Sequence, residues 1–204
     1  MSHRSPPTVF EVWSETSARM FEGAMRANRA AIEAFGATAN GASGDGDAAD
    51  ADAEERIAPA EDLPGWETES EVEDQPTVGD VVRFGKVLSE NDVDRFAAAS
   101  GDTNPIHLDD QWADETRFEG RIVHGTLAAG LISAALARFP GSVVYLSQDL
   151  EFRAPVRLGD RVTAEVTIVE ALGDDRFRLR TTVEREDTRI IDGEAVVLID
   201  DPPA

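Results

Sequence analysis

Residues 125–139 read GTLAAGLISAALARF, a run in which Thr126, Ser133 and Arg138 are the polar positions. Alanine and leucine favour helix, and the run is long enough for about four turns. A helix that is apolar on nearly every face must be surrounded by other parts of the protein. The run therefore predicts a long buried helix at the centre of a domain core.

Four segments with the alternating pattern of β-strands follow this helix along the chain. Leu-Gly-Asp, Gly-Asp-Asp and Glu-Asp turns separate them. The segments are residues 143–153, 161–172, 176–186 and 189–199. Together they predict an α+β fold in which a curved antiparallel sheet wraps around the buried helix.

One strand and one helix are expected ahead of the buried helix. Residues 78–87 have strand character, and Ser89 with Asp92 three residues later forms a capping-box pattern. Helical spacing of apolar residues then runs up to Gly101, a residue type that often ends helices. We assign residues 76–204 to one compact domain.

The start of the chain carries another helical pattern. Residues 8–35 place Phe, Trp, Met and Ala at spacings of three, four or seven. Such an apolar stripe needs a partner. In the plainer interpretation this partner is the protein's own domain or its dimer mate. The alternative is a separate partner, such as a polymer granule or a synthase, held through residues 8–36. We assign residues 1–36 to an N-terminal amphipathic helix.

Residues 37–75 hold thirteen acidic side chains and one basic residue, Arg56. The segment begins with Gly, Ala and Asp and offers little apolar surface to bury. Chains of this composition repel themselves and stay disordered. We therefore expect an acidic linker between the N-terminal helix and the domain.

The chain of 204 residues has 19 basic and 41 acidic side chains, which gives a net charge of −22. This charge repels phosphate backbones and argues against nucleic-acid binding. Lys86 is the single lysine, so the other basic residues are arginines. At about 1 M salt the screening length falls to about 3 Å, and such an excess is tolerated. We expect a protein from a salt-loaded cytoplasm, as in a halophilic archaeon, with an ordinary acidic protein as the alternative.

The sequence also limits location and redox chemistry. Its apolar runs are shorter than the roughly 20 residues that a membrane-spanning helix needs. The first residues lack the apolar centre and cleavage site of a signal peptide. The chain contains no cysteine, which excludes disulfides, thiolate metal sites and cysteine nucleophiles. We expect a cytoplasmic protein that is not transmembrane.

Residues able to carry chemistry lie between the two predicted helices of the domain, in residues 100–133. Pro105 biases Asn104 towards extended backbone. We therefore expect Asp102, Asn104 and His107 on an extended loop that turns them towards one cavity. A carboxylate near an imidazole suits acid–base catalysis, whereas solvated loop side chains are the plainer interpretation.

The string SGDTNPIH at residues 100–107, followed seventeen residues later by His124-Gly125, resembles the MaoC-like, R-specific enoyl-CoA hydratase family. The resemblance covers about residues 76–200 and includes FRAPV at residues 152–156. It implies the hot-dog fold, in which the sheet is the bun and the buried helix the sausage, and it implies a homodimer. The chain before this domain does not match the family's catalytic domain.

The resemblance implies reversible syn addition of water to a trans-2-enoyl-CoA, giving an (R)-3-hydroxyacyl-CoA without a cofactor beyond the substrate's own coenzyme A. Asp102 and His107 match the family's dyad, which holds one water, and the base role asks for an apolar pocket around Asp102. The N–H of Gly125, at the positive end of the helix, would face the thioester oxygen as an oxyanion hole. In a cell that stores polyhydroxyalkanoate, the reaction would supply monomers.

Three further positions have both a functional and a structural interpretation. Asn104 orients the loop or the dyad, or belongs to a plain Asn-Pro turn. Ser133 hydrogen-bonds in the pocket, as the resemblance implies, or bonds back to the carbonyl of Ala129. His124 holds the start of the helix or contacts the substrate. Two histidines seventeen residues apart make no recognised metal-ligand spacing, so no metal is expected.

Coenzyme A is anionic, and four arginines near the motif or the matching strand are candidates for its phosphates. A surface ion pair is the alternative for each of them. They are Arg117, Arg121, Arg153 and Arg157. Three other functions stay open at this point: a granule- or enzyme-tethering protein, a hydratase of a branched or dicarboxylic acyl-CoA, and a hot-dog thioesterase.

Overall fold

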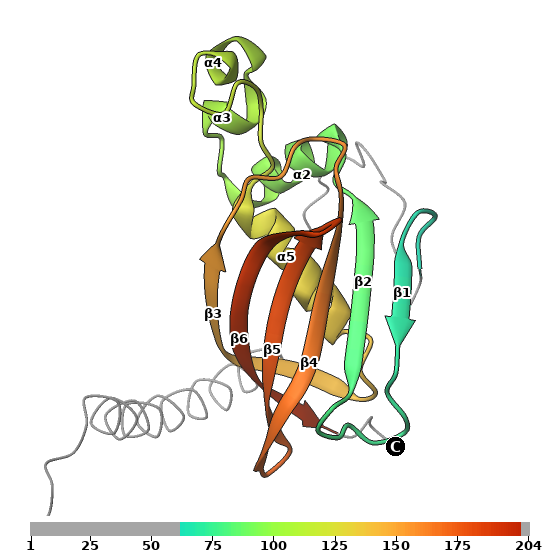
Figure 1. The fold of residues 1–204 in the computed structure, drawn as a ribbon. Coiled ribbons are helices and arrows are strands. Elements are labelled where there is room, and N and C mark those ends of the chain that lie inside the picture. Colours follow the sequence, from blue (N-terminus) through green and yellow to red (C-terminus); the bar gives the residue numbers. More distant parts are fainter. Residues whose placement is uncertain (1–61, 201–204) are drawn as a thin grey trace, which may run out of the picture. The chain divides into compact units, whose positions relative to one another are not determined.

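The computed structural model describes residues 62–200 of the chain (Figure 1). In this part, six antiparallel strands form one sheet in the order β1-β2-β4-β5-β6-β3. The strands are β1 (Glu67–Ser70), β2 (Val81–Val87), β3 (Ser142–Phe152), β4 (Arg161–Gly173), β5 (Arg176–Arg185) and β6 (Thr188–Asp200). The helices are α2 (Glu90–Ser100), α3 (Pro105–Leu108), α4 (Asp110–Asp114) and α5 (Gly125–Leu136). None of these helices is long and apolar enough to cross a membrane.

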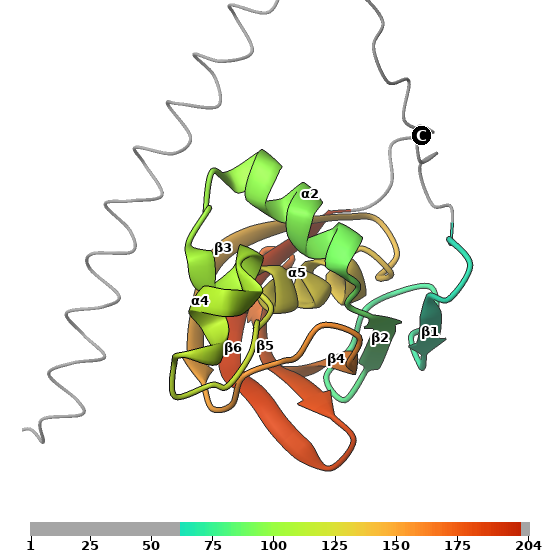
Figure 2. The same ribbon diagram turned by 90° about the horizontal axis from the view of Figure 1, so that it is seen from above.

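The curved sheet wraps around α5, as the two views show (Figure 1, Figure 2). α5 packs against β2, β4 and β5. Its buried residues recur at helical spacing: Ala128, Leu131, Ile132, Ala135 and Leu136. The predicted arrangement of a curved antiparallel sheet around a central helix is therefore confirmed.

The surface of α5 is only partly enclosed within a single chain. Thr126, Gly130, Ser133 and Ala137 form an exposed stripe of small residues at spacings of three and four. The helix also ends at Leu136, earlier than the sequence predicts. The expectation that every face is surrounded is not met by the described residues of one chain.

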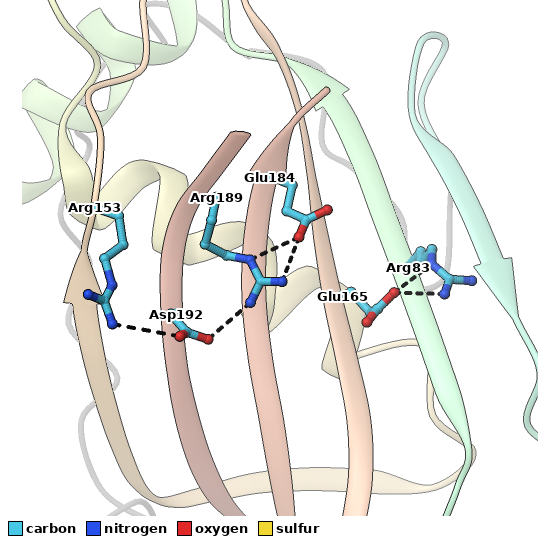
Figure 3. A network of polar contacts seen from close by, with 6 residues as sticks. All are labelled: Arg83, Arg153, Glu165, Glu184, Arg189 and Asp192. Atoms are coloured by element: carbon cyan, nitrogen blue, oxygen red, sulfur yellow. Dashed lines mark hydrogen bonds and ion pairs between the residues drawn. The ribbon is translucent and has the colours of Figure 1, made fainter. Parts of the chain in front are cut away.

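The predicted strands of the domain correspond to β2 through β6, with small shifts at their ends. β4 shows why alternating apolar residues predict these strands. Its residues 162, 164, 166 and 168 are fully buried or nearly so, while Glu165 faces the opposite side of the sheet (Figure 3). Alternation of this kind follows from the two-residue period of a strand.

The first strand lies in a segment that the sequence assigns to the acidic linker. β1 pairs with β2 along its four residues, and all four of its side chains are exposed. Just before it, Trp66 packs edge-on against Phe84 with ring centroids 5.4 Å apart. The folded part therefore starts before the expected boundary at residue 76. The sequence does not indicate this earlier start, because β1 has no alternation of apolar and polar residues. The rest of the predicted linker and the predicted helix of residues 1–36 lie outside the described residues.

The capping box at the start of α2 is confirmed. The Ser89 hydroxyl accepts the Asp92 N–H at 3.2 Å, and the Asp92 carboxylate accepts the Ser89 N–H at 2.8 Å. Partial burial opposes the charged form of Asp92, but hydrogen bonds from Lys86 and Ser89 outweigh it and hold the pKa of Asp92 below its ordinary value. The helix ends at Gly101, whose φ of 77° is the left-handed conformation that glycine adopts without strain.

The face of the sheet opposite α5 carries paired charges (Figure 3). Arg83 on β2 lies 2.7 Å from Glu165 on β4. Arg189 at the start of β6 lies 2.7 Å from Glu184 and 3.1 Å from Asp192. One side of the sheet thus supplies the core and the other a charged surface.

Candidate active site

The loop after α2 brings the predicted motif onto a one-turn helix rather than a fully extended loop. Asn104 is extended, with ψ of 127°, as expected for a residue before proline. Its side chain accepts the N–H of Ile106 at 3.2 Å, and Pro105 supplies a preset first helical residue. His107 therefore lies on α3, which corrects the expectation of an extended loop. Asn104 is the N-cap that begins this helix.

Asp102 is oriented by the same turn. One of its carboxylate oxygens accepts the backbone N–H of Asn104 at 3.3 Å. Its side chain is exposed in the single chain, whereas its predicted role as a base asks for an apolar pocket. The described residues of one chain therefore do not supply such a pocket around Asp102.

His107 is buried, with 9% of its surface exposed, and its ring is held by the backbone. Its Nδ1 lies 2.8 Å from the carbonyl oxygen of Ile122. Because a carbonyl only accepts, we assign the proton to Nδ1, which leaves Nε2 as a free acceptor. Burial lowers the pKa of His107 below its ordinary value of 6.5, and the Ile122 carbonyl and the Asp102 charge oppose this only in part. At neutral pH the ring is therefore uncharged.

His124 lies beside His107, and it has 1% of its surface exposed. The two imidazole rings stack with centroids 3.9 Å apart. Nε2 of His124 lies 2.9 Å from the backbone carbonyl oxygen of Asp102, so it carries the proton of this hydrogen bond. Nδ1 of the same ring is buried and has no hydrogen-bond partner in the described part of the chain.

Gly125 is the first residue of α5. The N-cap residue, His124, makes no side-chain capping bond, so the first N–H groups of the helix are not capped by a side chain. A Cβ atom at Gly125 would lie 2.9 Å from Cε1 of Phe152. A side chain larger than glycine would thus crowd the Phe152 ring at the start of α5.

A mostly apolar cavity of about 340 Å³ opens between His107 and the start of α5. Its lining residues are His107, Arg117, Phe118, Ile122, Val123, Gly125, Ala128, Phe152, Arg153, Ala154, Pro155, Val156, Ile190 and Ile191. The cavity brings together His107 and the start of α5, but Asp102 and Asn104, which were expected to face the same cavity, are not among its lining residues. An imidazole acceptor and free N–H groups beside an apolar hollow suit a polar group carried on an apolar chain.

The four candidate arginines divide into two pairs. Arg117 and Arg153 line the cavity, and Arg153 also pairs with Glu151. Arg121 instead donates to the His107 carbonyl at 2.8 Å and to Glu90 at 2.7 Å.

Arg157 donates to the carbonyls of Phe118, Gly120 and Arg121. Arg121 and Arg157 therefore hold the loop around the site, a role that no local spacing in the sequence indicates.

Ser133 does not line this cavity among the described residues. It lies two turns beyond Gly125 on the exposed stripe of α5, and its side chain hydrogen-bonds Tyr145 on β3. Burial raises the pKa of Tyr145 above its ordinary value of 10.0, and the Ser133 bond offsets this in part. The structure thus places Ser133 on the face shared by α5 and β3.

Asp102, His107 and His124 offer one donor atom each, all within 4.8 Å of one another. Their spacing along the chain hides this grouping, since the two histidines come from α3 and from the residue before α5. Two imidazoles and a carboxylate can bind a transition metal, and they can equally hold one water. That the site works without metal stays a prediction.

A curved antiparallel sheet around one central helix, with an acid–imidazole pair beside the helix N-terminus, defines a hot-dog fold protein with a candidate acid–base site. The model of the family described as MaoC like domain matches residues 72–191. The chain belongs to this family.

Its relatives are close over the domain. The chain is 44% identical over 124 residues to the (R)-specific enoyl-CoA hydratase of Rhodospirillum rubrum, covering 59% of this chain and 86% of that protein. It is 48% identical over 117 residues to the 3-hydroxybutyryl-CoA dehydratase of Methylorubrum extorquens, covering 56% and 74%. The solved (R)-hydratase from A. caviae, involved in PHA biosynthesis, has a TM-score of 0.59 and 38% identity, covering 63% of this chain and 100% of that chain.

Proposed function

We propose that this chain catalyses the reversible hydration of trans-2-enoyl-CoA to (R)-3-hydroxyacyl-CoA. The observation that carries the proposal is the grouping of Asp102 with His107, whose Nδ1 is held by the Ile122 carbonyl and whose ring lines the cavity at the start of α5. The relatives named as hydratases and dehydratases support the same chemistry. The chain is an enzyme of the hydro-lyase class.

The proposed reaction uses one water held between Asp102 and His107. Neutral His107 accepts one O–H of this water at Nε2 and thereby orients it. Asp102 takes the other proton while the water oxygen forms its bond to C3 of the substrate. The protonated Asp102 then returns that proton to C2. Because oxygen and proton come from one side, the addition is syn.

The N-terminus of α5 would stabilise the negative charge that develops on the thioester oxygen. The N–H of Gly125 has no side-chain cap competing for this position. Free N–H groups and the positive end of the helix dipole both favour an oxyanion there. Gly125 is thus the proposed oxyanion hole.

The coenzyme A part of the substrate needs a cation on a chain of net charge −22. Arg117 and Arg153 line the cavity, so we propose them for its phosphates. The apolar cavity lining would accept the acyl chain.

A homodimer would complete the site. β3 is the last strand of the sheet, and Val144, Tyr145 and Phe152 on it are exposed at 48%, 39% and 54%. An uncovered strand edge with exposed apolar side chains favours pairing with a second copy. The neighbouring stripe on α5 and the exposed Asp102 would then be covered together.

The proposal extends to a metabolic role, the supply of (R)-3-hydroxyacyl-CoA monomers for polyhydroxyalkanoate synthesis. The A. caviae hydratase, whose fold the chain shares, is described as involved in that pathway. Hydration of a branched or dicarboxylic acyl-CoA is the alternative substrate assignment. Rates on enoyl-CoA substrates of increasing chain length, and on branched ones, separate these roles.

The deciding experiment follows the loss of enoyl absorbance of crotonyl-CoA for the wild type and Asp102→Asn. We expect the variant to lose about two to four orders of magnitude in kcat, because it keeps the shape of the side chain but removes the base. Asp187→Asn, which changes an exposed carboxylate between β5 and β6, is the matched control and should keep its rate. A wild type that hydrates no enoyl-CoA, or an Asp102→Asn variant with full rate, overturns the proposal.

A further inference from the structure

His124 connects all three parts of the candidate site. Its Nε2–H donates to the backbone carbonyl of Asp102 at 2.9 Å. Its ring stacks on His107, with centroids 3.9 Å apart. Its own backbone leads directly into Gly125 at the start of α5. One side chain thus contacts the aspartate and the histidine of the dyad and adjoins the oxyanion position.

Packing alone does not account for an imidazole at this place. The ring lies between Phe96 of α2, at a centroid distance of 4.9 Å, and His107 of α3. Its Nδ1 is buried without a partner among the described residues. A buried polar atom without a hydrogen bond costs free energy, and an apolar ring would fill the same space without that cost. The contribution that an apolar ring could not make is the hydrogen bond from Nε2 to the backbone carbonyl of Asp102.

That hydrogen bond acts on the residue whose placement matters most. Asp102 follows Gly101, whose left-handed backbone turns the chain out of α2. The other contacts of Asp102 are local: its carboxylate accepts the N–H of Asn104, and its own N–H donates to the Ser100 hydroxyl at 3.1 Å. The bond to His124 is a long-range contact that holds the Asp102 backbone against α5, twenty-two residues further along the chain.

We propose that His124 is a positioning residue. Its Nε2–H fixes the backbone of Asp102. The Asp102 carboxylate and the His107 ring then hold one water beside the thioester that the Gly125 N–H binds. The inference rests on the proposed hydratase function. It assigns His124 no contact with the reacting atoms. A displacement of about 1 Å in such a group can cost about a hundredfold in rate, so loss of the bond should lower kcat.

Two variants separate the hydrogen bond from the ring. His124→Phe keeps an aromatic ring between Phe96 and His107 but has no donor, and it also removes the unpartnered Nδ1. His124→Gln loses the ring but reaches about as far as Nε2 with an amide N–H. We expect His124→Phe to fold with unchanged or higher thermal stability and to lose about a hundredfold in kcat on crotonyl-CoA, with a smaller change in KM. We expect His124→Gln to stay within about tenfold of the wild type.

The opposite ranking, with the phenylalanine variant active and the glutamine variant inactive, would show that stacking is what matters and would overturn the proposal. Equal loss in both variants, or no loss in either, overturns it as well.

Amide hydrogen exchange of residues 101–107 gives a readout that does not depend on turnover. Exchange should rise in His124→Phe and stay near wild type in His124→Gln, because only the latter keeps the bond to Asp102. Unchanged exchange in both variants contradicts the positioning role even if the wild type proves inactive. An inactive wild type with the expected exchange pattern would refute the proposed hydratase function alone.

Discussion

His107 and His124 are each held by a backbone carbonyl, and this determines which ring nitrogen is free. The Ile122 carbonyl engages Nδ1 of His107, while the Asp102 carbonyl engages Nε2 of His124. His107 therefore offers Nε2 as an acceptor near the cavity. The same residue type thus serves two purposes at neighbouring positions, because its two nitrogens differ in what they contact.

The lowered pKa of His107 leads to a prediction at acidic pH. The proposed reaction needs neutral His107, and burial lowers its pKa below 6.5. We expect kcat/KM to stay flat through neutral pH and to fall on the acid side with a midpoint below 6.5. The unfolded chain binds this proton at higher pH than the folded chain, so stability should also decrease as pH falls through this range.

A pH–rate profile and thermal unfolding at several pH values test this. The matched variant, His107→Gln, should lose the contribution of this residue to the pH dependence of stability. An acid midpoint above 6.5 would contradict the assignment of a neutral, buried ring.

Gly125 gives a second prediction at the residue scale. In Gly125→Ala the new Cβ would meet the Phe152 ring at 2.9 Å. The ring is half exposed and can swing aside, so we expect little loss of stability. We expect kcat/KM to fall by at least tenfold, because the methyl group stands where the thioester must approach the N–H.

The double variant Gly125→Ala with Phe152→Ala is the control. It removes the crowding with the ring but keeps the methyl group. Activity that returns in the double variant would show that the ring, and not substrate approach, requires glycine at this position.

At the scale of elements, the loop of residues 118–122 determines where the site forms. Arg157, on the segment between β3 and β4, donates to the carbonyls of Phe118, Gly120 and Arg121. Ile122 also forms an isolated bridge with Arg157. Since the Ile122 carbonyl engages Nδ1 of His107, this arginine acts on the dyad through the loop.

We therefore predict that Arg157→Met lowers the free energy of unfolding by about 2–4 kcal/mol, because it leaves partly buried carbonyls without their charged donor. Thermal or denaturant unfolding measures this change. Arg178→Met, which removes a more exposed ion pair with Glu170 at 2.9 Å, should cost about 1 kcal/mol or less. Equal effects of the two changes would contradict the structural role of Arg157.

At the scale of the whole molecule, charge dominates the surface. The paired residues of Figure 3 still leave a net charge of −22 on the chain. Self-repulsion of this size destabilises a compact state in dilute buffer and is screened by salt.

We predict that the unfolding temperature rises as KCl increases from about 0.1 M to about 2 M, as screening shortens the range of repulsion. Calorimetry in KCl and in an uncharged osmolyte separates screening from general exclusion effects. Equal stability at low and high salt would contradict the predicted adaptation to a salt-rich cytoplasm.

The boundary of the folded domain gives the last prediction. A chain that starts at residue 76 lacks β1, the Trp66 contact with Phe84 and the ion pair of Asp62 with Arg138 at 2.6 Å. We expect it to be less stable by roughly 3 kcal/mol than a chain that starts at residue 62, mainly through the lost aromatic packing. Unfolding curves of the two chains test this.

The chain starting at residue 62 also tests the predicted tether. It should keep full turnover but lose co-sedimentation with a granule or synthase if residues 8–36 anchor the protein. Loss of turnover or of dimerisation would instead assign that segment to the folded enzyme.

Much of the fold could be predicted because it depends on local patterns. The apolar run of residues 125–139, the alternation in β4 and the capping box at Ser89 are each set by neighbours along the chain. The string at residues 100–107 likewise indicated the family, which the match over residues 72–191 confirms. β1 escaped prediction because its pairing with β2, and not its own exposed side chains, makes it a strand.

The site needed the tertiary structure. The family resemblance indicated Asp102, His107 and Gly125, but not the stacking of two histidines or the carbonyls that hold them. Nor could it separate Arg117, which lines the cavity, from Arg157, whose donors are taken up by backbone carbonyls. The physical reason is that helix and strand patterns repeat along the chain, whereas a hydrogen bond between distant residues leaves no period in the sequence.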